Sequence, residues 1–239
     1  MADLSHVVLR PVRGHHAFEA CVEQLATAIR LGVFPLGGAL PNERDLAERL
    51  SVSRATLREA MAALREAGLV KTVRGRSGGT VVILKPKSPT GRMTGHIDAA
   101  QRQAWLDSLD FRRIVEAGAA WLLASKDLDR EQVATLEAAH ESVATARTKP
   151  EHRQADSLFH LTIASLTGSA SLVEAVTKVQ ATLHEMLSAI PVLSKNIDHS
   201  DRQHAEIVRA VLERDPARAR RVMEAHCDDT SALLRGLLT

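Results

Sequence analysis

The chain has 239 residues, of which 45% are hydrophobic and 25% are charged, and it contains two cysteines. These proportions are typical of a soluble globular protein and exclude a disordered chain, a collagen-like fibre and a disulfide scaffold. The sequence shows neither a transmembrane-length apolar run nor a signal-peptide pattern, so we expect a cytoplasmic protein with reduced thiols and no membrane contact.

Charge is unevenly distributed along the chain. Residues 1–94 contain fourteen Lys and Arg against eight Asp and Glu, a net charge of +6. Residues 95–239 contain seventeen against twenty-one, a net charge of −4, and eight of the eleven histidines. This division predicts two domains with different partners, the basic one being the candidate for binding a polyanion.

The basic part predicts three helices and a hairpin. Apolar residues at steps of three and four predict helices over residues 17–31, about 42–50 and 54–67. Asn42 is a favourable N-cap for the second helix, and Gly68 is a C-terminal stop for the third. Two β-branched runs, residues 69–73 and 80–84, predict a hairpin with a basic, glycine-rich tip. Because only a short connector separates the second and third helices, the pattern is typical of a winged helix-turn-helix.

A winged helix-turn-helix carries its DNA-binding residues at fixed places. The N-terminal end of the third helix enters the major groove, where arginine pairs with guanine and small hydroxyls reach phosphates or bases. The candidates on the helices and the hairpin tip are Arg44, Ser53, Arg54, Thr56, Arg58, Arg74 and Gly75. The alternative is that the arginines form a solvated face with neighbouring glutamates.

The stretch ALPNERDLAERLSVSRATLREAMAALREAGLVKTVRGRSGGTVV resembles the DNA-binding domain of the GntR family of bacterial transcription regulators. The resemblance implies DNA contacts from the arginine of the LPNER segment, the Ser-Arg pair and the arginine of the REA segment. It therefore assigns these contacts to residues of the same set, Arg44, Ser53, Arg54, Thr56 and Arg58, and more loosely to Arg74 and Gly75 in the wing.

A segment rich in Pro, Gly, Ser and Lys predicts a linker between two domains. The expected boundaries are 1–84 for the DNA-binding domain, with its core at about 15–84, 85–96 for the linker and 97–239 for the second domain. The second domain shows six or seven helical patterns and no convincing strand, so the fold class is mainly α with an all-helical C-terminal bundle. Two helix starts carry capping signals, namely Ser171 with Glu174 and Asp215 followed by Pro216.

Four polar residues of the bundle form a candidate metal site. Asp156 and His160 are four residues apart on one predicted helix and share a face. His204 and His226 lie eleven residues on either side of the break at Asp215, so an antiparallel helix pair would place them level, about 16 Å from the turn. Three histidines and a carboxylate suit zinc, nickel or manganese. The alternative is a local hydrogen bond between Asp156 and His160.

Three further stretches, DFRRIVEAGAAWLLA, DSLFHLTIASLTGSASLVEAV and HAEIVRAVLERDPARARRVMEAH, resemble the FCD ligand-sensing domain of the FadR-like branch of GntR regulators. The resemblance implies that the four residues hold a divalent metal and that a small carboxylate effector completes its coordination. It also matches Arg112 to an arginine that can clamp the effector carboxylate. The alternative for Arg112 is an ion pair with Glu116. Relatives often have asparagine near the position of Ser169. This sequence departs from the family pattern there, in the turn that follows the predicted helix with Asp156.

We therefore expect a DNA-binding transcription regulator, a repressor rather than an enzyme, that binds a palindromic operator as a homodimer and responds to a small carboxylate. The rival function is a metal-dependent hydrolytic enzyme fused to a DNA-binding head, in which the metal would activate water. A third is an architectural DNA-binding protein indifferent to metabolites.

Overall fold

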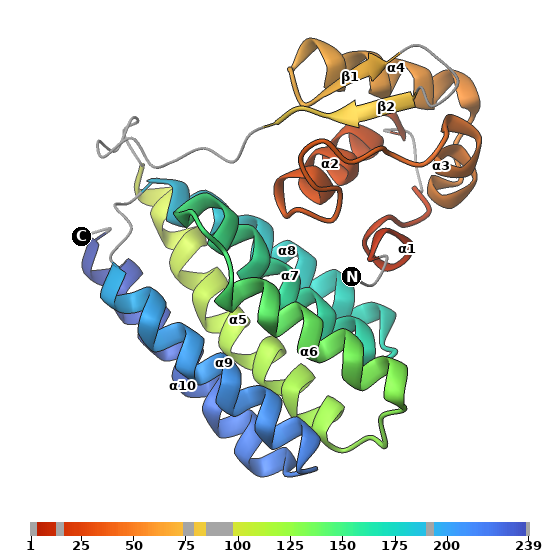
Figure 1. Ribbon diagram of the computed structural model, residues 1–239. Coiled ribbons are helices and arrows are strands. Elements are labelled where there is room, and N and C mark those ends of the chain that lie inside the picture. Colours follow the sequence, from red (N-terminus) through yellow and green to blue (C-terminus); the bar gives the residue numbers. More distant parts are fainter. Residues whose placement is uncertain (1–3, 13–16, 74–78, 85–97, 190–193, 238–239) are drawn as a thin grey trace. The chain divides into compact units, whose positions relative to one another are not determined.

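The computed structural model describes residues 4–12, 17–73, 79–84, 98–189 and 194–237 (Figure 1). The chain divides into two compact units, with the division between residues 86 and 87. The predicted linker at 85–96 and the hairpin tip with Arg74 and Gly75 lie outside the described residues.

The N-terminal unit is a winged helix-turn-helix, as predicted. Its elements in chain order are α1 (Ser5–Val8), α2 (Ala17–Arg30), α3 (Glu43–Leu50), α4 (Arg54–Glu66), β1 (Val70–Val73) and β2 (Gly79–Val82). The two strands pair antiparallel, with Val70 opposite Val82. The sequence pattern did not predict α1, which is only four residues long.

Local sequence signals fix the turn between α3 and α4. The side chain of Asn42 accepts a hydrogen bond from a backbone N–H in the first turn of α3, and Ser53 does the same for α4. Between them, Ser51 ends α3 in the left-handed conformation, with φ of 53°. Gly68 ends α4 with φ of 72°, a value that glycine adopts without steric cost. These four residues set the bounds of α3 and of α4, which is the predicted recognition helix.

The C-terminal unit is the predicted helical bundle. Within its described residues the helices are α5 (Ala99–Ala124), α6 (Arg130–Ala144), α7 (Lys149–Leu166), α8 (Ala170–Ala189), α9 (Ser194–Leu212) and α10 (Pro216–Leu237). Helix α5 packs against α7, α8, α9 and α10 (Figure 1). Small residues of α5 such as Ala117 and Ala120 lie in one buried cluster with Phe159 and Ile207. No described helix is both long and apolar enough to span a bilayer.

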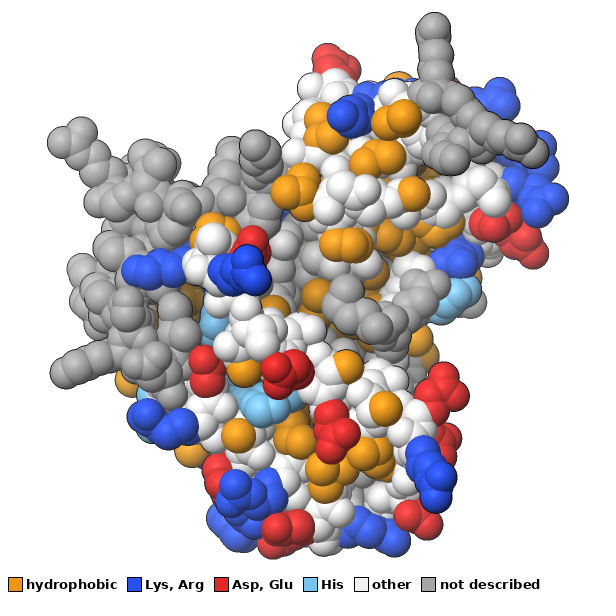
Figure 2. Space-filling view, in the orientation of Figure 1, with side chains coloured by type: hydrophobic (Ala, Val, Ile, Leu, Met, Phe, Trp, Pro, Cys, Tyr) orange, Lys and Arg blue, Asp and Glu red, His pale blue; other side chains and the backbone are white. Residues whose placement is uncertain are grey.

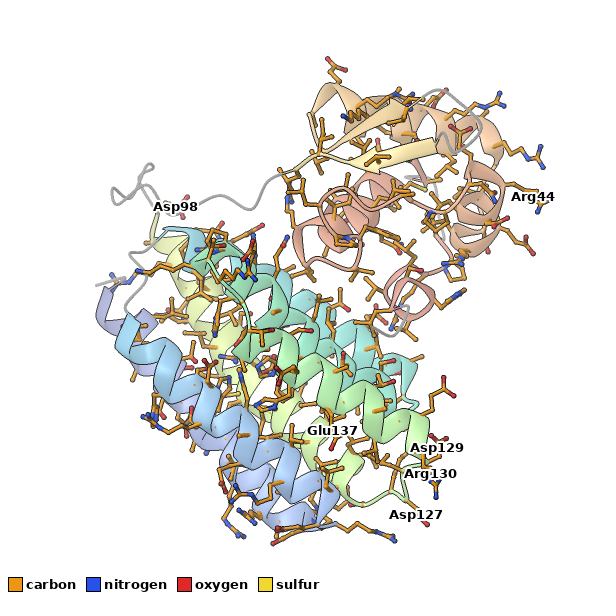
Figure 3. All side chains as sticks on the ribbon, viewed as in Figure 1. Arg44, Asp98, Asp127, Asp129, Arg130 and Glu137 are labelled. Atoms are coloured by element: carbon orange, nitrogen blue, oxygen red, sulfur yellow. The ribbon has the colours of Figure 1, made fainter. Side chains whose placement is uncertain are left out.

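Acidic and hydroxyl side chains cap the starts of α5, α6 and α7, and Figure 3 labels two of them, Asp98 before α5 and Asp129 before α6. The predicted cap at Asp215 is present, because its carboxylate accepts a hydrogen bond from the Arg218 N–H at 2.9 Å. The predicted capping box of Ser171 and Glu174 is wrong. Helix α8 begins two residues earlier than that box requires, and the Ser169 hydroxyl accepts from the Leu172 N–H at 3.3 Å. Serine at this position therefore supplies the helix cap.

Candidate metal centre and DNA-binding face

Four side chains from three helices meet inside the bundle. Asp156 and His160 come from α7, His204 from α9 and His226 from α10, and one ligand atom from each lies within 4.8 Å of the others. The ring centroids of His204 and His226 are 4.7 Å apart, and those of His160 and His204 are 5.5 Å apart. All three histidines are buried, whereas Asp156 is partly exposed.

The hairpin of α9 and α10 explains why two distant histidines face each other. Arg214 turns the chain with a positive φ of 55°, and Asp215 caps α10 with Pro216 as its first residue. The helices then pack side by side. Since His204 and His226 are equally far from the turn, each helix carries its histidine to the same level of the bundle.

Two of the three buried histidines have the protonation state that metal binding needs. Burial lowers the pKa of His204 and of His226 well below the usual value, so both imidazoles are neutral near pH 7. Among the described residues, neither ring nitrogen of His204 has a hydrogen-bond partner, nor does the Nε2 of His160. Buried polar atoms without partners are costly, so these nitrogens are suited to a ligand that accepts their lone pairs.

The size of the cluster also fits a divalent cation. Zinc and similar ions bind nitrogen and oxygen ligands at about 2.0–2.2 Å, so ligand atoms on opposite sides of one ion lie up to about 4.2 Å apart. The observed limit of 4.8 Å is wider by a few tenths of an ångström. Small side-chain rotations close that difference, and neutral imidazoles with one carboxylate are the donor set of a borderline cation.

A buried ion pair on α5 adjoins the cluster. Arg112 and Glu116 are each 1% exposed, and the Arg112 Nε donates to Glu116 Oε2 at 3.0 Å. The Arg112 Nη2 lies 3.1 Å from His226 Nε2, while its Nη1 has no hydrogen-bond partner among the described residues. Arg112 therefore forms the ion pair given above as the alternative to effector binding, and it also reaches the histidine cluster.

Charge and burial oppose each other at Glu116. Burial alone would raise the pKa of this carboxyl, but the charges of Arg112 and His160 hold it well below its usual range. The His160 Nδ1 lies 3.0 Å from Glu116 Oε2 and helps to lower the pKa of that carboxyl. Glu116 is thus a fixed carboxylate between the cluster and α5.

The arginines predicted to bind DNA are exposed on the N-terminal unit. The side chains of Arg44 and Arg58 are both 71% exposed, and each meets an acidic neighbour, Asp45 at 3.4 Å and Glu43 at 3.3 Å respectively. Arg44 points outward from the start of α3 (Figure 3), on an edge of the unit where Figure 2 shows basic side chains with a few acidic ones between them. Such exposed ion pairs contribute little to stability.

The remaining three candidates outside the wing stand at the start of α4. The Ser53 and Thr56 hydroxyl oxygens are 2.8 Å apart, and Ser53 Oγ accepts from the Thr56 N–H at 3.0 Å. Ser53 is thus the N-cap of α4. Arg54 is exposed at the first position of that helix.

Comparison with known proteins identifies the two units. The family model for bacterial regulatory proteins of the gntR family matches residues 18–82, and the FCD domain model matches residues 107–229. The chain belongs to the GntR family. The Glc operon transcriptional activator of Escherichia coli K12 is 30% identical to this regulator over 220 residues, which cover 87% of the chain and 85% of the relative.

Two further relatives agree with this assignment. The transcriptional repressor NanR of Klebsiella aerogenes is 28% identical to this GntR-family regulator over 240 residues, covering 95% of the chain and 89% of the relative. The solved structure of E. coli McbR/YncC has a TM-score of 0.54 at 18% identity, with 93% of this chain and 99% of that chain covered. That structure therefore shares the fold.

Some residues at the centre of this GntR-family regulator escaped the sequence analysis. Gln180 on α8 donates to Glu116 Oε1 at 2.6 Å, the Cys227 thiol lies 3.6 Å from Glu116 Oε2, and Gln203 Oε1 lies 3.2 Å from His226 Nδ1. Gln203 precedes His204 and Cys227 follows His226, so these two residues are also equally far from the turn at Asp215. The spacing argument that paired the two histidines would therefore have identified them as well. No comparable signal in the sequence marks Gln180, because only the packing of α8 against α5 brings it next to Glu116.

Proposed function

We propose that this GntR-family chain is a transcriptional repressor whose operator affinity changes when a small carboxylate binds at a divalent-metal site in the helical unit. The observation that carries the proposal is the cluster of Asp156, His160, His204 and His226. Among the described residues, the buried ring nitrogens of His160 and His204 have no hydrogen-bond partner, and neither has the Nη1 of Arg112 nearby. A bound zinc, nickel or manganese ion would supply a Lewis-acidic docking point for a carboxylate.

Arg112 supports the assignment of a carboxylate as the effector. Its guanidinium is held in place by Glu116, and its buried Nη1 has no hydrogen-bond partner in the part of the chain that the structure describes. Arginine binds carboxylates through parallel N–H donors, and such charge-assisted hydrogen bonds are the strong ones. If His226 binds the metal through Nε2, its lone pair is no longer available to Arg112 Nη2, so a second donor becomes available to the effector.

The DNA-binding role belongs to the N-terminal unit. We assign base and phosphate contacts to Arg44, Ser53, Arg54, Thr56 and Arg58, with Arg74 and Gly75 in the wing. Two such heads on a homodimer would bind the half-sites of a palindromic operator, about 34 Å apart or a multiple of it. The effector regulates by binding one arrangement of the heads more tightly than another. One relative is named an activator and another a repressor, so a promoter–reporter assay in cells with and without the gene decides the direction of regulation.

Elemental analysis tests the metal site directly. The untagged protein, purified without chelator, should contain about one divalent metal per chain, and Asp156→Ala should lose it. Calorimetric titration with a panel of small carboxylates should give binding to the metal-loaded protein only, and the same compounds should change operator affinity. Absence of metal from both proteins, even after incubation with zinc, nickel and manganese, would refute the site. Recovery of a chemically altered carboxylate would favour the rival hydrolytic enzyme.

A further inference from the structure

A chain of polar contacts leads from the surface of the helical unit to one of the candidate metal ligands. The Oε1 of Gln203 on α9 lies 3.2 Å from the Nδ1 of His226 on α10. The Gln203 Nε2 donates to Asp229 Oδ2 at 2.7 Å, and His199 Nε2 lies 2.9 Å from the same oxygen. Gln203 is partly buried, whereas the side chains of Asp229 and His199 are half exposed. The residue that meets His226 is thus itself held by a charged neighbour.

The carboxylate of Asp229 determines which way the Gln203 amide points. A carboxylate only accepts hydrogen bonds, so the amide nitrogen, which is a donor, has to face it. In the reversed orientation the Gln203 carbonyl oxygen would meet the Asp229 oxygen, and neither atom could donate. The Gln203 Oε1 is therefore turned toward His226, where it acts as an acceptor.

Two independent contacts assign the same tautomer to His226. The acceptor Gln203 Oε1 calls for a proton on Nδ1. At the other ring nitrogen, Arg112 Nη2 lies 3.1 Å from Nε2, and a guanidinium has donors but no acceptor, so Nε2 carries a lone pair. His226 therefore offers Nε2, and not Nδ1, as its ligand atom.

We propose that Gln203 is a positioning residue of the candidate metal centre, which holds His226 in the tautomer that binds a cation through Nε2, and that Asp229 holds Gln203 in turn. The inference rests on the metal site of the proposed function. A histidine that binds a metal commonly donates its other ring N–H to such a partner, which fixes the ring and makes the ligating nitrogen more basic. Glu116 has the corresponding place beside His160, whose Nδ1 lies 3.0 Å from Glu116 Oε2.

The alternative is a structural role, because the bond between Gln203 and Asp229 also joins α9 to α10. A second contact between the same helices provides the control. Arg218 on α10 donates to Glu206 on α9, and among the described residues neither of them contacts a candidate ligand. Replacing Glu206 by leucine thus removes a contact between the two helices without changing the surroundings of His226.

The zinc affinity of the full-length chain, measured by competition with a chromophoric chelator, tests the positioning role. Gln203→Leu removes the acceptor and should weaken zinc binding by about 10–100-fold, whereas Glu206→Leu should bind zinc as the wild type does. Gln203→Glu combined with Asp229→Asn exchanges the carboxylate and the amide, keeps an acceptor for His226 Nδ1 and should bind zinc about as tightly as the wild type. Circular dichroism should show the same helix content in every variant.

The outcomes separate this inference from the proposed function. Zinc binding that Gln203→Leu leaves unchanged would overturn the positioning role but not the metal site, and a wild type without zinc affinity would overturn both. Equal losses in Gln203→Leu and Glu206→Leu, or a double variant no better than Gln203→Leu, would make the role structural.

The tautomer of His226 is tested in the wild type, without metal. Long-range proton–nitrogen correlation spectra of chelator-treated protein with isotope-labelled histidine distinguish the ring nitrogen that carries a proton from the one that carries a lone pair. His226→Gln identifies the signals of His226 by their loss. We expect the proton on Nδ1. A proton on Nε2 would overturn the inference, whatever the zinc affinities.

Discussion

The buried carboxylate of Glu116 offers a direct test of the energetics around the candidate metal centre. Glu116→Gln preserves the shape of the side chain but replaces a charge that faces Arg112 at 3.0 Å, with both residues 1% exposed. The Arg112 charge would stay buried without its partner, and breaking a buried pair in this way costs about 3–5 kcal/mol of unfolding free energy. The new amide nitrogen would also face the donor of either Arg112 or Gln180 in place of an acceptor, because the two donors meet different oxygens of Glu116.

Asp228→Asn is the matched control, because it makes the same carboxylate-to-amide change in an exposed ion pair. Asp228 accepts from Arg113 at 2.8 Å, but the two side chains are 53% and 43% exposed, and such pairs contribute only about 0–1 kcal/mol. Both tryptophans of the chain, Trp105 and Trp121, lie on α5, so their fluorescence during urea unfolding reports on the helical unit alone. The comparison is made on chelator-treated protein at one concentration. Equal costs for the two variants would refute the reasoning.

Three further predictions concern the DNA-binding face and the helix hairpin. Arg54→Ala and Arg58→Ala should each weaken specific operator binding, measured by fluorescence anisotropy, by about 1–3 kcal/mol. Arg44→Ala, if it removes a phosphate contact, should lower the slope of log affinity against log salt concentration by about 1. Unchanged affinity and slope in folded variants would show that α4 is not the recognition helix. Ser53→Ala should reduce stability by about 1 kcal/mol, because α4 loses its cap. Ser53→Asp should keep the cap and still impair DNA binding. Thermal unfolding reports on the cap and fluorescence anisotropy on DNA binding, so the two variants separate the two roles of Ser53. Asp215→Ala should cost about 1 kcal/mol in urea unfolding, and a cost near zero would show that the hairpin turn does not depend on this cap.

Local signals in the sequence determined the elements of this protein and part of its site. Asn42 and Asp215 cap helices as the sequence predicts, because a cap depends on its own side chain and the backbone of the next three residues. Ser53, which the sequence analysis did not predict as a cap, caps the helix that starts at the predicted residue, Arg54. The equal spacing of His204 and His226 about the hairpin turn is likewise written in the chain. The failed capping box at Ser171 shows the limit of such signals. Several residues near a helix start can act as the cap, and the end of the preceding helix at Gly168 selects Ser169.

Only the tertiary structure decided what surrounds the histidines and what is left uncovered. Arg112 reaches His226 across 114 positions of sequence, and Gln180 reaches Glu116 across 64. No periodicity encodes such contacts, because they depend on how α5, α8 and α10 rotate and translate against one another as the core closes. The same packing buries one side of α5 and leaves Phe111, Ile114 and Trp121 exposed on the other. Helical periodicity identifies apolar faces, but the competition among all six helices for the core determines which face another molecule can bind.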